Sequence, residues 1–194
     1  VGGLPDSPSR VAFTPTAVAE GQTVTFDGSK SSDPNDDALL YAWDFGDGSH
    51  GTGATATHVY ADNGTHTATL TVTENGSEGL TSSASVSVTV NNVAPTGTLT
   101  APATAVEGSS FSLALTNVSD PSPADVQAGL KIEYDCGAGF VASGNCGIAV
   151  DGPATRLVRA RVTDKDGGSN TYSASVTILN GNPVVNAFAG ATIV

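Results

Sequence analysis

One eight-residue motif occurs twice in this chain and constrains its fold more than any other feature. The first copy is Tyr41–Gly48 (YAWDFGDG), and a more divergent copy, Ile132–Gly139 (IEYDCGAG), follows 91 positions later. A long motif that recurs in this way indicates that one module was copied. The 194 residues are therefore expected to form two similar modules in tandem, each long enough for a modest core.

The balance of charge limits the partners that the chain can have. It holds 19 acidic residues against 7 basic ones, a formal net charge of −12. So acidic a surface argues against nucleic acid as a partner, because binding phosphates requires Lys and Arg. It attracts divalent cations instead. No apolar run reaches the roughly 18 residues of a membrane-spanning helix, so direct insertion into a membrane is not expected.

The spacing of apolar residues predicts an all-β fold. Short runs alternate between apolar and polar residues, which is typical of strands with one buried face, and turn residues separate the runs. In the first half, strands are expected at residues 11–13, 23–26, 39–45, 65–72 and 84–90. The second half repeats the same order of signals. No segment has a sustained helical period, so the prediction is two tandem immunoglobulin-like β-sandwiches without helices.

Four segments are expected along the chain. Residues 1–10, rich in Gly, Pro and Ser, are expected to be a leader or linker, residues 11–92 the first sandwich and residues 93–181 the second. Residues 182–194 resemble the start of the second module. Two interpretations of this tail are open: it is the first strand of a further module, or it is a strand exchanged with another copy of the chain.

Several motifs of the first module resemble those of the PKD (polycystic kidney disease) domain family. They are Ser31–Pro34, the Tyr41–Gly48 motif and His58–Tyr60, which stand in the family's order and spacing. Together they cover most of residues 11–90, and the set is specific. The first module is therefore identified as a PKD-like domain.

The second module looks like a divergent member of the same family. Tyr134, Cys136 and Ala138 replace the Trp, the Phe and the second Asp of the first copy. A longer stretch, residues 120–130, also precedes the second copy of the motif. The resemblance is therefore weaker there than in the first module.

The resemblance implies a seven-stranded sandwich that is used outside the cell as a spacer, an adhesion module or a ligand-presenting module, and not as a catalyst. Such modules often accompany secreted hydrolases, surface-layer proteins and adhesins. Some PKD domains bind calcium near the loop that precedes the motif strand, with help from the incoming segment and from the turn after the long strand. Glu74 stands in that turn of the first module, and Asp164 and Asp166 in that of the second.

Structural roles are expected for the residues of the family motifs. An alternating strand more often turns its Trp into the core than toward a bound sugar, although the sugar-stacking role stays open. Aspartates beside glycines at a sharp turn favour hydrogen bonds to backbone N–H groups over a direct ligand role. The residues concerned are Trp43, Asp44, Gly46, Asp47, Gly48, His58 and Tyr60. No catalytic residues are predicted, because no nucleophile is paired with a His and an acid.

The acidic loop after the second predicted strand is the candidate metal site. Asp33, Asp36 and Asp37 lie within five residues, and carboxylates so close together repel one another unless water or a cation screens them. Calcium binds six to eight oxygens and suits a flexible acidic loop. Together with Glu74, these residues form a candidate calcium site, and a solvated acidic loop is the equal alternative.

The two cysteines, Cys136 and Cys146, favour a disulfide across a loop or hairpin. Such a bond would suit an oxidising compartment. A pair of free buried thiols is the alternative.

Taken together, the sequence predicts a non-catalytic extracellular spacer or adhesion segment of a longer surface or secreted repeat protein. Its expected partners are neighbouring modules of the same array, with other copies of itself or surface polymers as further candidates. Two alternatives stay open. One is a structural subunit of a filament or surface layer assembled through the tail, and the other is a ligand-binding accessory module of a secreted hydrolase.

Overall fold

The computed structural model describes residues 17–33, 36–75, 79–148 and 152–182, which fall into two compact units. The first unit comprises Val1–Ala94, Asp120–Leu130 and Asp164–Gly168. The second comprises Pro95–Ser119, Lys131–Thr163 and Ser169–Val194. The predicted boundaries between modules stay a prediction. The strand expected at 11–13 and the tail from 183 onward lie outside the described residues.

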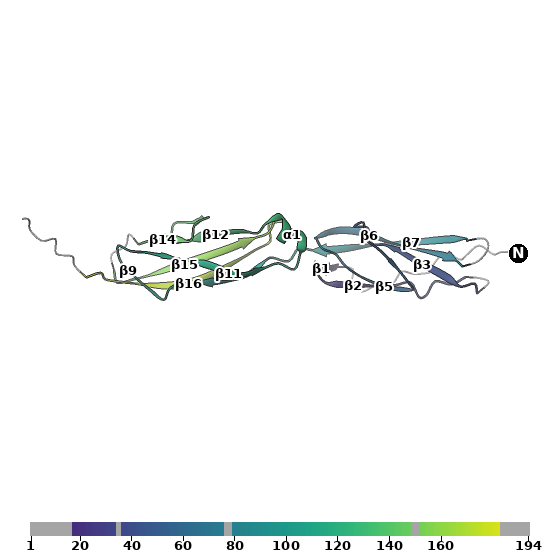
Figure 1. Ribbon diagram of the computed structural model, residues 1–194, viewed down its shortest axis with the longest axis horizontal. Coiled ribbons are helices and arrows are strands. Elements are labelled where there is room, and N and C mark those ends of the chain that lie inside the picture. The colour runs from purple at the N-terminus through teal and green to yellow at the C-terminus, as the bar shows by residue number, and fades with distance from the viewer. Residues whose placement is uncertain (1–16, 34–35, 76–78, 149–151, 183–194) are drawn as a thin grey trace, which may run out of the picture. The chain divides into compact units, whose positions relative to one another are not determined.

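Seven described strands build the first unit (Figure 1). A five-stranded sheet has the order β1 (Ala17–Ala19), β7 (Thr81–Asn91), β6 (Gly64–Glu74), β3 (Leu39–Asp44) and β4 (His50–Thr52). A two-stranded sheet pairs β2 (Thr23–Asp27) with β5 (Thr55–Val59). Only β1 runs parallel to its neighbour, and the other pairs are antiparallel. The strands expected at 23–26, 39–45, 65–72 and 84–90 are confirmed as β2, β3, β6 and β7.

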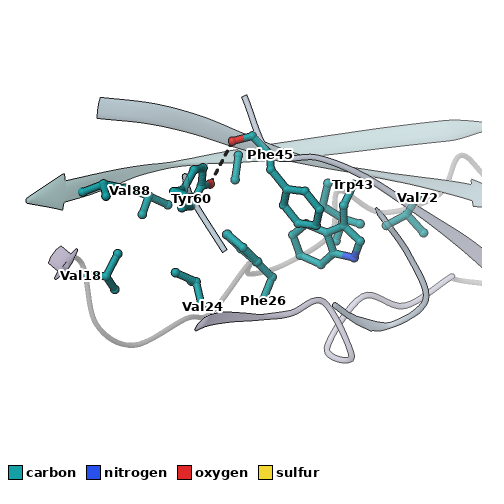
Figure 2. Packing of buried hydrophobic residues seen from close by; sticks show 11 residues of the cluster. Val18, Val24, Phe26, Trp43, Phe45, Tyr60, Val72 and Val88 are labelled. Carbon is teal, nitrogen blue, oxygen red and sulfur yellow. Dashed lines mark hydrogen bonds between the residues drawn. The ribbon is translucent and has the colours of Figure 1, made fainter. Parts of the chain in front are cut away.

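The core of the first unit draws side chains from both of its sheets (Figure 2). Phe26 enters from β2, whereas Trp43, Leu70 and Val88 enter from β3, β6 and β7. Alternation explains this arrangement, since successive side chains of a strand point to opposite faces of the sheet. All four side chains are at least 98% buried, and their burial is the main stabilising contribution to the unit.

The second unit repeats this plan. Its five-stranded sheet has the order β13 (Phe140–Val141), β12 (Lys131–Asp135), β15 (Ala154–Thr163), β16 (Ser169–Leu179) and β9 (Thr104–Val106). Two short sheets pair β11 (Ala114–Ser119) with β8 (Thr96–Thr100), and β10 (Ser110–Ser112) with β14 (Asn145–Gly147). Along the chain, β9 is the first strand of this large sheet and β16 is the last. These two strands pair in parallel, as β1 and β7 do in the first unit. The all-β, immunoglobulin-like fold class is confirmed.

The predicted disulfide between Cys136 and Cys146 is present, with 5.5 Å between the two Cα atoms. Cys136 follows β12 in the large sheet, and Cys146 lies in β14 of a small sheet. The bond therefore joins two sheets of the second unit. Cys146 is fully buried in the core of that unit.

The expectation that helices are absent is wrong for one segment. The helix α1 (Pro123–Ala128) lies within residues 120–130, the longer stretch that precedes the second copy of the motif. The Ser122 hydroxyl accepts a hydrogen bond from the Asp125 N–H at 3.2 Å and caps the helix, and Pro123 suits its first turn. Six residues are too few to show a helical period in the sequence. Within the described residues, no helix has the length and apolar character of a membrane span.

Candidate functional site

The motif tryptophan is part of the scaffold. Trp43 is 2% exposed, and its ring packs 5.5 Å from that of Phe26 in the core (Figure 2). Its indole Nε1 donates a hydrogen bond to the Gly53 carbonyl at 2.9 Å. Because the ring is buried and its polar edge is hydrogen-bonded, Trp43 has no surface left for stacking on a sugar.

The other motif side chains connect the two sheets of the first unit through direct contacts. The Tyr60 hydroxyl donates a hydrogen bond to the Phe45 carbonyl at 2.9 Å (Figure 2). The His58 ring stacks on Phe45 with 4.3 Å between ring centroids, and its Nε2 lies 2.7 Å from Asp47 Oδ2. Burial raises the pKa of Tyr60 to about 12. Although burial alone would raise the pKa of Asp47, the Ser49 N–H and His58 together lower it.

The two motif aspartates hold the glycine turn. Asp44 Oδ1 accepts the Gly46 N–H, and Asp47 Oδ1 accepts the Ser49 N–H, both at 2.9 Å. Gly46 has a φ of +80°, and a Cβ there would lie 2.5 Å from the Thr67 carbonyl oxygen, so only glycine fits. These carboxylates therefore serve the backbone, as turn-forming aspartates do.

The structure places the four predicted calcium ligands around one loop but not in one compact group. Asp33 is buried, and its Oδ1 accepts the Asp37 N–H at 3.3 Å. The Asp33 carbonyl accepts the Asp36 N–H, and Asp36 has a φ of +62°. Glu74 ends β6, opposite Leu39 in the register with β3. Among the described residues, the carboxylates that lie close enough to share a cation belong to another part of the first unit. The calcium site predicted at the acidic loop therefore stays a prediction.

Five carboxylates of the first unit converge into what we call the acidic cluster: Glu20, Asp62, Asp120, Asp125 and Asp164. They form two overlapping groups. Glu20, Asp62 and Asp125 each place one oxygen within 4.8 Å of the other two, and so do Asp120, Asp125 and Asp164. Asp125 therefore belongs to both groups, and the cluster offers two neighbouring positions to cations.

Local backbone contacts orient the carboxylates at the edge of this cluster. Glu20 follows β1, and its Oε1 accepts the Val93 N–H at 2.7 Å. Asp120 Oδ1 accepts the Ser122 N–H at 2.8 Å, just before α1. Asp164 follows β15, and its Oδ1 accepts two N–H groups of its own turn while its Oδ2 accepts the Asn92 side-chain amide at 3.0 Å. The carboxylates are thus held in place by groups outside the cluster.

Several oxygens of the cluster are buried and accept no hydrogen bond. They are Glu20 Oε2, Asp120 Oδ2 and both oxygens of Asp125. Asp125 is fully buried and Glu20 is 1% exposed. Burial raises the pKa of Asp125 despite the nearby Lys165 ammonium. Burial likewise raises the pKa of Glu20, although its bond to the Val93 N–H opposes the shift. Buried carboxylates without partners cost free energy unless a cation neutralises them.

Lys165 pairs with carboxylates of this cluster. Its Nζ lies 2.7 Å from Asp62 Oδ1 and 3.3 Å from Asp125 Oδ1, and it also contacts the carboxylate of Asp166. These neighbours raise the pKa of Lys165, Asp166 first and Asp62 next. Within the described part of the chain, the Lys165 ammonium brings a single positive charge to these five carboxylates, so the cluster has the composition of a site for divalent cations.

Sequence reasoning identified only one edge of this cluster. The family resemblance pointed to Asp164 and Asp166, but Glu20, Asp62 and Asp125 were not singled out. They come from segments more than forty residues apart, and neither spacing nor composition links them. One signal was available: the Glu20-Gly21 pair recurs as Glu107-Gly108, and it could have marked this glutamate as more than a turn residue.

Glu107 makes the same kind of backbone contact in the second unit as Glu20 makes in the first, which supports a structural role for this recurring glutamate. Its Oε1 accepts the N–H of Gly181, two residues after β16, just as Glu20 Oε1 accepts the N–H of Val93, two residues after β7. In both units this glutamate therefore anchors the segment that leaves the last strand.

Residues 6–90 match the family model described as PKD domain. A microbial collagenase of Vibrio alginolyticus is 39% identical over 79 residues, which are 41% of this chain and 10% of the relative. Collagenase ColA of Clostridium perfringens is 38% identical over 68 residues, 35% of this chain and 6% of the relative. The chain thus spans a tenth or less of these two enzymes.

Among solved structures, the PKD1 domain of Vibrio anguillarum Epp is similar to part of the chain. The two are 26% identical, and the match covers 46% of this chain and 96% of that domain with a TM-score of 0.38.

Proposed function

We propose that this chain, whose residues 6–90 match the PKD domain family model, is a non-catalytic accessory segment of a longer extracellular protein. The observation that carries the proposal is the match to a small part of much larger enzymes that are named collagenases. A segment that forms 6–10% of such an enzyme is expected to assist it and not to contain its catalytic site.

The engagement of the motif residues supports a non-catalytic role. Trp43, Tyr60 and His58 are used in the core and in the contacts between sheets. Asp44 and Asp47 are used in a backbone turn. Residues committed to the scaffold are not available for chemistry on a substrate. The disulfide is in keeping with an extracellular location, since such bonds persist in oxidising compartments.

The surface favours a spacer over a module that binds sugars. Among the described residues, every aromatic side chain is buried or partly buried, and the exposed large apolar side chains are all Leu or Val. Sugar binding usually relies on exposed aromatic rings. The names of the relatives nevertheless keep a second candidate open, an accessory module that holds a secreted hydrolase on collagen.

The repeated sheet order supports the proposal that the second unit is a divergent PKD-like module. The order β13-β12-β15-β16-β9 reproduces β4-β3-β6-β7-β1 element by element, including the single parallel pair. We therefore extend the spacer role to both units.

Calcium is the cofactor that we propose for this segment. Asp120, Asp125 and Asp164 each place one oxygen within 4.8 Å of the other two, and the acidic loop with Asp33 and Glu74 is a second candidate site. Carboxylate oxygens are the ligands that calcium prefers. Excess chelator is expected to lower the melting temperature by several degrees, and an unchanged melting curve would contradict the proposal.

Two measurements on the purified chain test the proposed role. Light scattering during size exclusion gives its mass, and co-sedimentation with insoluble collagen fibrils gives its affinity for that polymer. A spacer is expected to be a monomer that stays in the supernatant. Sedimentation with the fibrils would favour the collagen-binding alternative, and a mass that rises with concentration would favour assembly of copies through the tail.

A further inference from the structure

We propose that Glu20, Asp62 and Asp125 form a cation position that the Lys165 ammonium occupies in place of a metal ion, so that this lysine limits how many divalent cations the acidic cluster accepts. The proposal goes beyond a role as an accessory module. It also does not depend on whether calcium binds at the neighbouring group of Asp120, Asp125 and Asp164.

The geometry of the three carboxylates suits a single bound ion. Their nearest oxygens all lie within 4.8 Å of one another. Oxygens that share one calcium ion at about 2.3–2.6 Å lie within roughly 5 Å of each other. Glu20 follows β1, Asp62 precedes β6 and Asp125 lies in α1, so three separate elements of the first unit hold these oxygens together.

The buried oxygens of this cation position do not all have hydrogen-bond donors. Glu20 is 1% exposed, and its Oε2 is buried without a hydrogen-bond partner, although Oε1 is held by the Val93 N–H. Asp125 is fully buried; its Oδ1 has the ion pair with Lys165 at 3.3 Å, and its Oδ2 accepts no hydrogen bond. A buried oxygen that lacks a donor and faces two other carboxylates is the environment that a cation stabilises.

Lys165 supplies the charge but not all of the contacts. Its Nζ lies beside Asp62 and Asp125, two of the three members of the group, at 2.7 and 3.3 Å. An ammonium has three N–H donors, and the third contact goes to Asp166. Glu20 is therefore left without a donor from Lys165. The lysine also lies on a turn, with its side chain 30% exposed, so it can leave the position without unfolding a strand.

The shared Asp125 couples the two positions. A positive ammonium at the first group repels a divalent ion at the second, because like charges a few ångströms apart in a buried site interact strongly. Removing the ammonium is expected to open one position and to strengthen the other. The natural chain should then bind at most one ion at the cluster, and a chain without Lys165 should bind one more.

Isothermal titration with calcium chloride tests this expectation on the full chain. The variant Lys165→Gln removes the ammonium and keeps a polar side chain of similar length. We expect one additional calcium ion per chain relative to the natural protein, and a melting temperature that falls without calcium and recovers with it. Lys131→Gln is the matched control, because Lys131 pairs with Glu133 and its side chain is 68% exposed. It should leave the stoichiometry unchanged.

Two further variants locate the additional ion. Lys165→Arg keeps the charge and is expected to bind the same number of ions as the natural chain. The double variant Glu20→Gln with Lys165→Gln is expected to lose the additional ion, because Glu20 belongs only to the position that Lys165 vacates.

Each possible outcome decides the proposal. It is overturned if Lys165→Gln binds no additional calcium, if the double variant keeps the additional ion, or if Lys165→Gln fails to fold even in millimolar calcium. Failure of the calcium proposal for Asp120, Asp125 and Asp164 looks different. In that case the natural chain binds no ion at the cluster, while Lys165→Gln still gains one.

Discussion

The two units solve the same packing problem by different chemistry. In the first, Phe45 stacks on His58 and thereby joins the large sheet to the small one. In the second, the disulfide between Cys136 and Cys146 joins the corresponding sheets. The motif and the strand register make these two pairs structural equivalents.

The register identifies the equivalence. Cys136 occupies the position of Phe45 in the repeated motif. The run Glu20–Phe26 recurs as Glu107–Leu113, which aligns Val24 with Phe111. Val24 pairs with His58 between β2 and β5, and Phe111 pairs with Cys146 between β10 and β14.

Cys146 therefore takes the place of His58, and a covalent bond replaces a ring stack. The second unit needs such a bond more, because its buried core contains a single aromatic residue among those described, Phe111, whereas the first contains Phe26, Trp43, Phe45 and Tyr60. A core with less apolar burial gains more from a crosslink.

The largest effect is expected from removing the aromatic core of the first unit. Trp43→Ala should cost about 3–5 kcal/mol of unfolding free energy, because it leaves a cavity among buried rings. Tyr134→Ala, at the equivalent position, should cost less, because Tyr134 is only partly buried. Hydrogen exchange of β6 and β16 separates the two units. Equal losses of protection would show that the two cores do not differ as described.

Reducing the disulfide should affect the second unit next most strongly. Opening a loop of this length costs about 2–3 kcal/mol in the chain-entropy model. The chain has a single tryptophan, Trp43, so its fluorescence reports the first unit alone. With reductant, the unfolding transition followed by circular dichroism should acquire a component at lower urea, while the fluorescence transition stays in place. A shift of the fluorescence transition would contradict the expectation that the two units unfold independently.

A smaller loss is expected when the hydrogen bond between Tyr60 and Phe45 is removed. Tyr60→Phe should cost about 1–2 kcal/mol, because the Phe45 carbonyl loses its donor. The raised pKa of about 12 adds a dependence on pH. The unfolded phenol ionises near pH 10 and the folded one near pH 12, so this contribution to stability is present below pH 10 and lost as the pH rises through 12. Alkaline melting curves of the natural chain should show that loss, and those of Tyr60→Phe should not.

The smallest effect concerns the turn that both motifs share. Asp135 Oδ1 accepts the N–H groups of Gly139 and Gly137, in that order of effect, and these bonds lower its pKa below the ordinary 3.8. The resulting stability is present above pH 3.8 and is lost as the pH falls through the lower folded value. Asp135→Asn should therefore lower the melting temperature at neutral pH and have little effect at the acid end. A deficit that is the same at all pH values would rule out this carboxylate as the cause.

Much of the fold could be predicted from local patterns, as particular strands show. The alternation of Ala68, Leu70 and Val72 with threonines marks β6, and a similar pattern marks β7. The strands β4 and β5 escaped prediction because His50–Thr52 and Thr55–Val59 contain few large apolar residues. The helix α1 escaped because a serine cap and a proline, and not a period, define it.

By itself, the sequence determined the strand pattern, the duplication, the PKD-like motifs and the pair of cysteines, because each depends on residues that are neighbours or on spacings that repeat. Only the tertiary structure decided which carboxylates meet. Glu20, Asp62 and Asp125 lie in three distant segments, and long-range folding alone brings them together, with Lys165 beside two of them. The attraction of a cation depends on that convergence in space, which no local pattern in the chain encodes.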